Sequence, residues 1–316
     1  MNNNGTLFLP TQASTIANEV DSIFNFVLYT GLIIFAIVVI GLIFFSLKFR
    51  KRNENEELTS KVSENYVLEW TWSIIPSILV IVLFFMGFKT FMKMNIVPDN
   101  AIEIKTTGKK WMWVFDYPNG ANSTNILVVP KDKPIKILLS SSDVIHSFYI
   151  PDFRVKMDAL PNRYTTLWFE ANQIGEFPIY CTEFCGTGHS QMLGTVKVVE
   201  HDEYESYLAT SESKIEDNSI PLAELGENVY RDKACFTCHT LDGNSLIGPT
   251  FKGLFGSSIK HTDGSSVIVD ENYIRQSILE PQSKIVQGFA PVMPTYQGQL
   301  SDREIDGIIE FIKENK

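Results

Sequence analysis

Two long apolar runs stand out in the first ninety residues. No charged residue occurs from Ile23 to Leu47, and the stretch from Trp70 to Phe88 is a second run without charge. At about 1.5 Å of rise per residue, a helix of either length reaches across the hydrocarbon core of a bilayer. The pattern therefore predicts two transmembrane helices, over about residues 23–47 and 70–90, rather than two core helices of a soluble protein.

Within the first ninety residues, the basic residues lie mainly between these two apolar runs. They are Lys48, Arg50, Lys51, Arg52 and Lys61, whereas no Lys or Arg precedes Ile23. Because cytoplasmic loops carry the excess of positive charge, this loop is expected in the cytoplasm, with both termini on the outer side. The first run lacks the basic segment that begins a signal peptide, so we expect it to remain as an anchor.

The apolar period changes to two beyond residue 97. Short β-rich runs are separated by Gly, Pro and Asn clusters, and they cover Ala101–Lys105, Trp111–Tyr117, Ile135–Leu139, Thr165–Phe169 and Gly194–Val199. Many short strands at this spacing are typical of an all-β sandwich or barrel. We expect this domain to cover residues 98–200.

The last part of the chain returns to a helical pattern after an acidic segment. Residues 201–220 are predicted to form a solvated linker, since charge runs usually do. Ser301 and Glu304 form a capping-box pattern in front of an apolar stripe at Ile305, Ile308, Ile309 and Ile312. A second helix over residues 222–233, in which Gly226 allows close approach, is the expected partner. Residues 221–316 are thus predicted to be an all-α domain.

Composition and charge narrow the possible functions. The 316 residues are 44% hydrophobic and carry a formal net charge of -10, which argues against a nucleic-acid partner. The four cysteines form two close pairs, Cys181 with Cys185 and Cys235 with Cys238. Metal or haem chemistry explains such pairs better than a disulfide framework does.

The first cysteine pair lies in a loop rich in soft metal donors. His189 and Met192 follow Cys181 and Cys185, and His146 begins another predicted strand. Sulfur and imidazole donors suit copper, and two thiolates exceed what a single blue-copper ion uses, which suggests two metal ions bridged by sulfur. A structural zinc site from two Cys and two His is the alternative. A copper chaperone or redox sensor is a non-enzymatic alternative for the same loop.

The second cysteine pair belongs to Cys235-Phe236-Thr237-Cys238-His239, the C-x-x-C-H signature of covalent haem attachment. His239 is the expected proximal iron ligand. Met293, between two prolines at 291 and 294, is the expected sixth ligand. His261 is the competing candidate, but its polar loop indicates a surface position.

Residues 20–200 resemble subunit II of the haem-copper cytochrome c oxidases. The resemblance is carried by the 181–192 loop, by Asp143-x-x-His146, by residues 158–161 (Asp-Ala-Leu-Pro) and by residues 111–113 (Trp-Met-Trp). It implies a cupredoxin domain with a binuclear copper A centre. In that centre both cysteines bridge two coppers, and the other ligands are His146, His189, Met192 and the Glu183 carbonyl. The Glu183 side chain would reach a magnesium or manganese ion shared with subunit I.

The resemblance extends to the C-terminal domain, which is similar to class I cytochrome c, with residues 248–249 (Gly-Pro) as the loop at the haem edge. It implies that Trp111 receives electrons and that Glu69 lies at the mouth of a proton pathway, although residue 112 is Met where the family often has Tyr. The implied partners are subunits I and III, with a cytochrome c or a bc-type complex as electron donor. The implied location is the inner membrane of a bacterium, with both redox domains outside.

The function that the resemblance implies is that of a respiratory electron carrier. Electrons would pass from the haem c to copper A and on to subunit I, a proton-translocating oxidoreductase that reduces oxygen to water. The alternative is the copper A subunit of a nitric oxide reductase. His201 and His261 receive no role.

Overall fold

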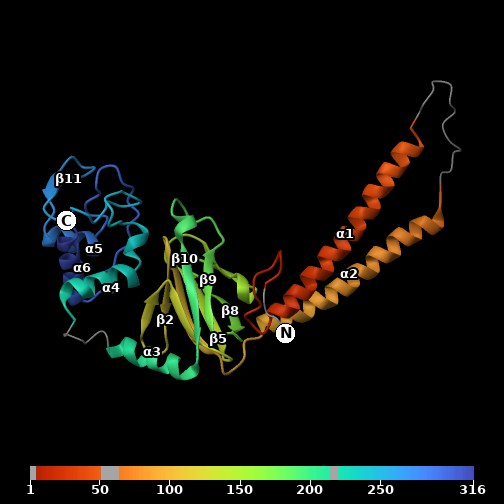
Figure 1. The fold of residues 1–316 in the computed structure, drawn as a ribbon, viewed down its shortest axis with the longest axis horizontal. Helices are drawn as coiled ribbons and strands as arrows, with labels where there is room; N and C mark the ends of the chain where they lie inside the picture. The colour runs from red at the N-terminus through yellow and green to blue at the C-terminus, as the bar shows by residue number, and fades with distance from the viewer. Residues whose placement is uncertain (1–4, 51–63, 214–219) are drawn as a thin grey trace. The chain divides into compact units, whose positions relative to one another are not determined.

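The computed structural model describes residues 5–50, 64–213 and 220–316 of the chain (Figure 1). The chain divides into two compact units, which meet in sequence at Ile96 and Val97. The first unit is helical, and the second contains both the β domain and the C-terminal helical domain.

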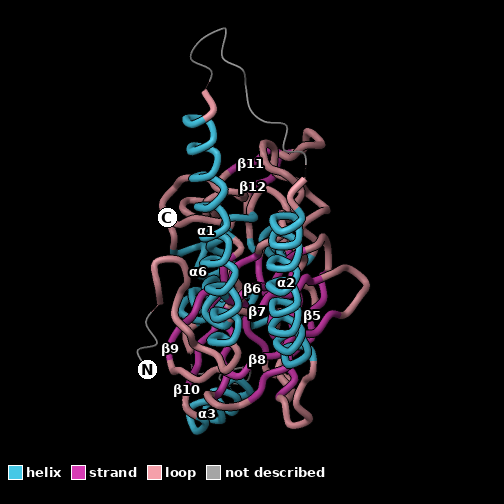
Figure 2. The backbone as a smooth tube through the Cα atoms, turned by 90° about the vertical axis from the view of Figure 1, so that its right-hand side faces the viewer, coloured by secondary structure: helices cyan, strands magenta, loops and turns pink. Residues whose placement is uncertain are grey.

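The first unit is a helical hairpin. Its helices are α1 (Ala17–Lys48) and α2 (Tyr66–Asn95), which lie side by side in Figure 2. Both are long and apolar enough to cross a membrane, and their apolar side chains are mostly exposed, as a lipid-facing surface requires. Lys93 Nζ and Glu19 Oε1 form an ion pair at 2.6 Å where the two helices meet.

The two helices cover the predicted spans and extend beyond them by several residues at most ends. Helix α2 continues through Pro76. Of the basic residues that predict a cytoplasmic loop, Lys51, Arg52 and Lys61 lie outside the described residues.

Two five-stranded sheets form the β domain. One has the order β3-β2-β1-β5-β8 and the other β4-β10-β9-β6-β7. The strands of the first sheet are β1 (Ile102–Lys109), β2 (Met112–Asp116), β3 (Asn122–Thr124), β5 (Pro134–Ser141) and β8 (Thr165–Glu170). Those of the second are β4 (Ile126–Pro130), β6 (His146–Ile150), β7 (Val155–Ala159), β9 (Gly175–Cys181) and β10 (Leu193–Val199).

Alternating burial along the strands produces the sandwich core. In β5, for example, Ile135, Ile137 and Leu139 are fully buried and the intervening side chains are partly exposed. All five predicted strands are present. Strand β6 begins at His146, where a further strand was predicted. Strand β4 was not predicted, because nearly all of its side chains are buried and it lacks the period-two alternation that marks a half-exposed strand.

The predicted acidic linker is helical over its first part. Helix α3 (His201–Ser213) follows β10 directly, and its Tyr204 is buried. Asn119 Nδ2 donates to the Leu208 carbonyl at 3.3 Å, and the rings of Tyr117 and Tyr207 are 5.8 Å apart. Aromatic contacts therefore fix this segment to the β domain despite its charge. Residues 214–219 lie outside the described residues.

The C-terminal domain is built on two crossed helices, α4 (Leu222–Asp232) and α6 (Asp302–Glu314). A Cβ atom added at Gly226 would lie 2.0 Å from the Gly307 carbonyl oxygen, so the helices touch backbone to backbone there. The capping box of Ser301 and Glu304 is present, and the predicted isoleucine stripe is buried. Helix α5 (Glu271–Leu279) and a small hairpin of β11 (Ser258–Lys260) and β12 (Ser266–Ile268) complete the domain.

The prediction that His261 lies on the surface is wrong. The ring is only 3% exposed, and its Nδ1 and Nε2 atoms lie 2.9 Å from Ser265 Oγ and 3.2 Å from Tyr273 Oη. The polar residues around it in sequence do face solvent, but the histidine turns inward because both ring nitrogens find partners there. His261 is not among the residues that line the cavity described below.

Candidate functional site

The loop between β9 and β10 gathers sulfur and imidazole donors at one end of the sandwich. Cys181 ends β9, and the buried Cys185 places its Sγ 3.8 Å from the Cys181 Sγ. Cys185 Sγ is also 3.5 Å from His189 Nδ1 and 3.8 Å from Met192 Sδ. The loop thus turns back on itself, so that residues spread over twelve positions surround one pair of sulfur atoms.

Strand β6 supplies another imidazole to this cluster. His146 is fully buried, and its Nδ1 lies 3.9 Å from Cys181 Sγ. The ligand atoms of His146, Cys181 and Cys185 all lie within 4.8 Å of one another. The Glu183 carbonyl oxygen is 3.3 Å from Cys181 Sγ. All six predicted donors therefore meet at one place.

The separation of the two sulfur atoms fits a shared metal. Two thiolates on one ion, each at about 2.3 Å, lie no more than about 4.6 Å apart, and the observed 3.8 Å is within that limit. Burial and the neighbouring Cys181 raise the pKa of the Cys185 thiol. Burial also opposes ionisation of Cys181, but its contacts with His146 and its hydrogen bonds with the backbone outweigh burial and lower its pKa. A cation would favour the thiolate form of both.

Asp143 orients His146, a role that the sequence analysis did not identify. Its Oδ1 lies 2.7 Å from His146 Nε2, and its Oδ2 accepts from the Lys110 backbone N–H at 2.7 Å. Because a carboxylate only accepts hydrogen bonds, Nε2 carries the proton, and the lone pair of Nδ1, on the side of Cys181, is available to a metal. Burial opposes ionisation of Asp143, but these hydrogen bonds outweigh it and keep its pKa below the usual value.

Trp111 lies against the same loop. Its side chain is 3% exposed, and its Nε1–H donates to the Cys185 carbonyl at 3.2 Å. A Cβ atom at Gly188 would lie 2.4 Å from the indole, so only glycine lets the loop backbone approach the ring this closely. The Glu183 side chain, by contrast, is exposed, and Glu69 lies in the first turn of α2.

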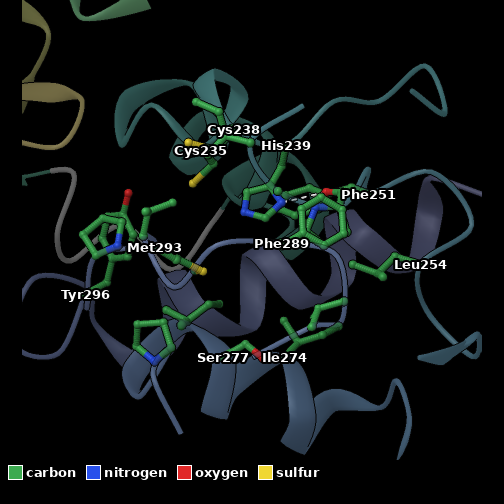
Figure 3. A pocket seen from close by; sticks show the side chains of 18 of the residues that line it. Cys235, Cys238, His239, Phe251, Leu254, Ile274, Ser277, Phe289, Met293 and Tyr296 are labelled. Atoms are coloured by element: carbon green, nitrogen blue, oxygen red, sulfur yellow. Dashed lines mark hydrogen bonds between the residues drawn. The ribbon is translucent and has the colours of Figure 1, made fainter. Parts of the chain in front are cut away.

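The C-terminal domain contains a large apolar cavity, shown in Figure 3. Cys235, Cys238 and His239 line one side of it and Met293 another, and the Met293 sulfur points inward (Figure 3). Most other lining residues are aliphatic or aromatic, among them Ile274, Phe289 and Ile308. The cavity has the chemistry that a flat, mostly apolar macrocycle needs, with an imidazole and a thioether available to its centre.

A backbone carbonyl holds the His239 imidazole through one of its two ring nitrogens. Its Nδ1 donates to the Pro249 carbonyl at 2.7 Å, so Nε2 is free to bind a metal. A Cβ atom at Gly248 would lie 2.6 Å from the ring, which explains the glycine in front of Pro249. Tyr230 Oη also donates to the His239 carbonyl at 2.6 Å.

The loop that carries Met293 is fixed by a side chain that the sequence analysis did not single out. Gln282 Nε2 donates to the carbonyls of Pro291 and Met293, each at 3.2 Å. No sequence motif marks Gln282, since it lies nine residues away from Pro291. Met293 itself is half-buried and packs against the domain core.

The fold and its two donor sets define a class of protein: a membrane-anchored electron carrier with one cupredoxin-like domain and one cytochrome c domain. Three families match successive parts of the chain. Residues 2–90 match "Cytochrome C oxidase subunit II, transmembrane domain", residues 121–201 match "Cytochrome C oxidase subunit II, periplasmic domain", and residues 223–316 match "Cytochrome c".

Two relatives named as cytochrome c oxidase subunit 2 agree with these matches. Cytochrome c oxidase subunit 2 of Alkalihalophilus pseudofirmus is 32% identical over 89% of this chain and 83% of its own length. The subunit 2 of Cereibacter sphaeroides is 28% identical over 65% of this chain and 79% of its own. The solved periplasmic domain of subunit II from Bradyrhizobium japonicum is 35% identical over 38% of this chain and 99% of that domain, with a TM-score of 0.37. The chain belongs to the cytochrome c oxidase subunit II family, in the form that carries a C-terminal cytochrome c domain.

Proposed function

We propose that this chain takes up electrons for a cytochrome c oxidase through two centres of its own. In this proposal its covalently attached haem c passes electrons to a binuclear copper A centre and then to subunit I, where oxygen is reduced to water. The observation that carries the proposal is that one compact unit holds both a six-donor soft-metal cluster and a C-x-x-C-H cavity with a methionine on its other side.

The residues of the copper site have distinct roles in this proposal. Cys181 and Cys185 would hold two copper ions, with His146, His189, Met192 and the Glu183 carbonyl as the other ligands. Met192 favours copper over zinc, because a thioether is a ligand for copper and adds nothing to a tetrahedral zinc site. The copper pair would supply a one-electron centre, and Asp143 would hold His146 in the tautomer that binds metal.

The haem site needs no step beyond binding and positioning by this chain. Cys235 and Cys238 would attach the haem through thioether bonds, and His239 and Met293 would supply the nitrogen and sulfur ligands of its iron. The iron would supply a second one-electron centre. Covalent attachment keeps the haem at high effective concentration near the copper site, so transfer between the two depends weakly on soluble cytochrome.

The remaining roles concern the membrane and the partner subunits. Trp111 receives electrons, Glu69 lies at the mouth of a proton pathway, and the exposed Glu183 side chain reaches a magnesium or manganese ion shared with subunit I. Both redox domains would lie outside the inner membrane of a bacterium, next to subunits I and III, because the basic residues between the two spans favour a cytoplasmic loop. The donor is a cytochrome c or a bc-type complex. The proposed final acceptor is oxygen, and the copper A subunit of a nitric oxide reductase is the alternative.

The proposed order of transfer is tested by rapid reduction of the full-length chain in detergent. A reduced cytochrome c is mixed with the oxidised chain while the haem and copper absorption bands are followed separately. The proposal predicts that the haem is reduced first, and that the copper band then changes at a rate independent of the donor concentration. A copper band that responds directly to donor concentration, ahead of the haem, would reject this order.

A further inference from the structure

Two neighbouring residues connect the copper site with the haem cavity. Trp111 is 3% exposed and donates to the Cys185 carbonyl in the copper loop. Met112, the next residue, is 5% exposed and belongs to the buried core of the C-terminal domain. It also lines the haem cavity, together with Cys235 and Tyr296. A single peptide bond therefore joins Trp111 of the copper site to Met112 of the haem cavity.

The surface around Met112 is held to the C-terminal domain by polar and apolar contacts. Lys109, which pairs with Met112 between β1 and β2, donates from Nζ to Gln299 Oε1 at 3.0 Å. Lys233 Nζ donates to Asn122 Oδ1 on β3 at 2.8 Å, and Val114 packs against the same core as Met112. Burial lowers the pKa of the Lys109 ammonium, which agrees with a position inside this contact.

From these contacts we infer that the chain's own haem domain occupies the face of the β domain beside Trp111, with Met112 as the positioning residue. The inference rests on the proposed function, and it identifies the chain's own haem domain as the partner that passes electrons to Trp111. A separate cytochrome would then deliver its electron to the haem and would have no direct access to the copper site. The internal step moves one electron and no proton: the haem iron is oxidised from Fe(II) to Fe(III), and the oxidised copper pair is reduced by one electron.

The side chain at position 112 suits this role. A methionine is long, unbranched and apolar, so it reaches from the first position of β2 into the wall of an apolar cavity. The polar contacts from Lys109 and Lys233 lie outside this apolar centre. An apolar centre with a polar rim is the usual anatomy of a protein interface, here between two domains of one chain.

The test is the rate of internal electron transfer in the full-length chain, loaded with both centres and purified in detergent. A light pulse reduces the haem through an added photoreductant, and the haem and copper bands are then followed. Met112→Ala is expected to slow transfer about tenfold or more, because truncating a buried methionine weakens the contact that holds the haem domain in place. Met112→Leu, which nearly preserves the volume, is expected to stay within about threefold of wild type.

Two further readouts separate positioning from general damage. The haem potential and the copper EPR signal should not change in Met112→Ala, whereas misfolding of either site would alter them. Met94→Ala, in α2 and outside the unit that holds both sites, is the matched control and should transfer at the wild-type rate. Should Met112→Ala fail to load its cofactors, the double variant Lys109→Ala with Asn122→Ala takes its place, and it is likewise expected to slow transfer.

The possible failures are distinguishable. A wild-type chain that loads both centres but transfers no electron between them would reject the proposed function itself. Wild-type transfer that proceeds, with loaded Met112→Ala or the double variant equally fast, would overturn only the inference made here.

Discussion

Asp143 offers a sharp test of the copper site, because it contacts the proposed copper ligands through its hydrogen bond with His146. The substitution Asp143→Asn keeps the shape of the side chain and removes its charge. The carboxylate accepts from His146 Nε2 and from the backbone N–H groups of Lys110 and Val144, at 2.6–2.7 Å. An amide has one oxygen and one NH₂ group, so in either orientation it presents a donor to another donor.

The expected loss follows from the position of Asp143 behind a metal-binding histidine. Removing such a partner typically weakens metal binding about 10- to 100-fold, which corresponds to about 1.4–2.7 kcal/mol. The pKa of Asp143 is lowered, so the carboxylate is ionised at neutral pH, and its contribution is lost only as the pH falls through that lowered pKa. The predicted defect is therefore fully present at pH 7.

The assay is competition for copper between the full-length chain and a chelator of known affinity, with copper per chain measured at each chelator concentration. Asp132→Asn is the matched control, because Asp132 is exposed and adopts a positive φ of 53° that asparagine also tolerates. Asp132→Asn should bind copper as the wild type does. Equal copper affinity in Asp143→Asn and wild type would refute the argument that Asp143 orients His146.

Three other predictions concern the C-terminal domain. Met293→Ala should lower the haem potential by roughly 0.1 V or more, within the about 0.8 V that axial ligands span, and an unchanged redox titration would show that another residue binds the iron. Gly226→Ala should destabilise the domain by about 1–3 kcal/mol, because its Cβ would meet the Gly307 backbone. The measurement is urea unfolding followed at the haem band, and Asn228→Ala, on the exposed face of α4, is the control that should not destabilise the domain. Equal stabilities of the two variants would contradict the close helix crossing. Hydrogen bonds from Ser265 lower the pKa of Asp263 to about 2, so Asp263→Asn should be less stable than wild type at neutral pH. In acid unfolding, the difference in stability between the two proteins should close as the pH falls from about 4 to about 2. A stability difference that persists at about pH 2 would contradict the lowered pKa of Asp263.

The parts of the fold that were predictable from sequence are those in which local pattern and structure coincide. The charge-free runs became α1 and α2, and the Ser301 capping box begins α6 where it was expected. Gly226 indicated a close helix crossing because a glycine inside a helix is costly without such a reason. Strand β4 and helix α3 were missed because near-complete burial hides one and acidic composition hides the other.

In the candidate sites too, the features that follow from local sequence pattern were predictable, and those that depend on long-range contacts were not. Cysteines four apart in a glycine-containing loop, with His189 and Met192 close behind, meet almost regardless of the surrounding fold, so their clustering was predictable. The role of Asp143 and the inward position of His261 depend on hydrogen bonds that only the folded chain creates. Met112 was noted only as a departure from the family pattern, because its contact with the haem cavity joins residues more than a hundred positions apart.

The central claim, that one chain holds a covalent haem and a two-copper centre, is tested most directly by its metal content together with its EPR spectrum. The full-length chain would be produced in a host that attaches haem c, reconstituted with copper and analysed for copper and iron per chain. The account predicts two coppers and one iron, with a mixed-valence copper signal. A single copper, or zinc in the cysteine loop, would contradict the copper A assignment and leave the cytochrome c domain as the only redox centre.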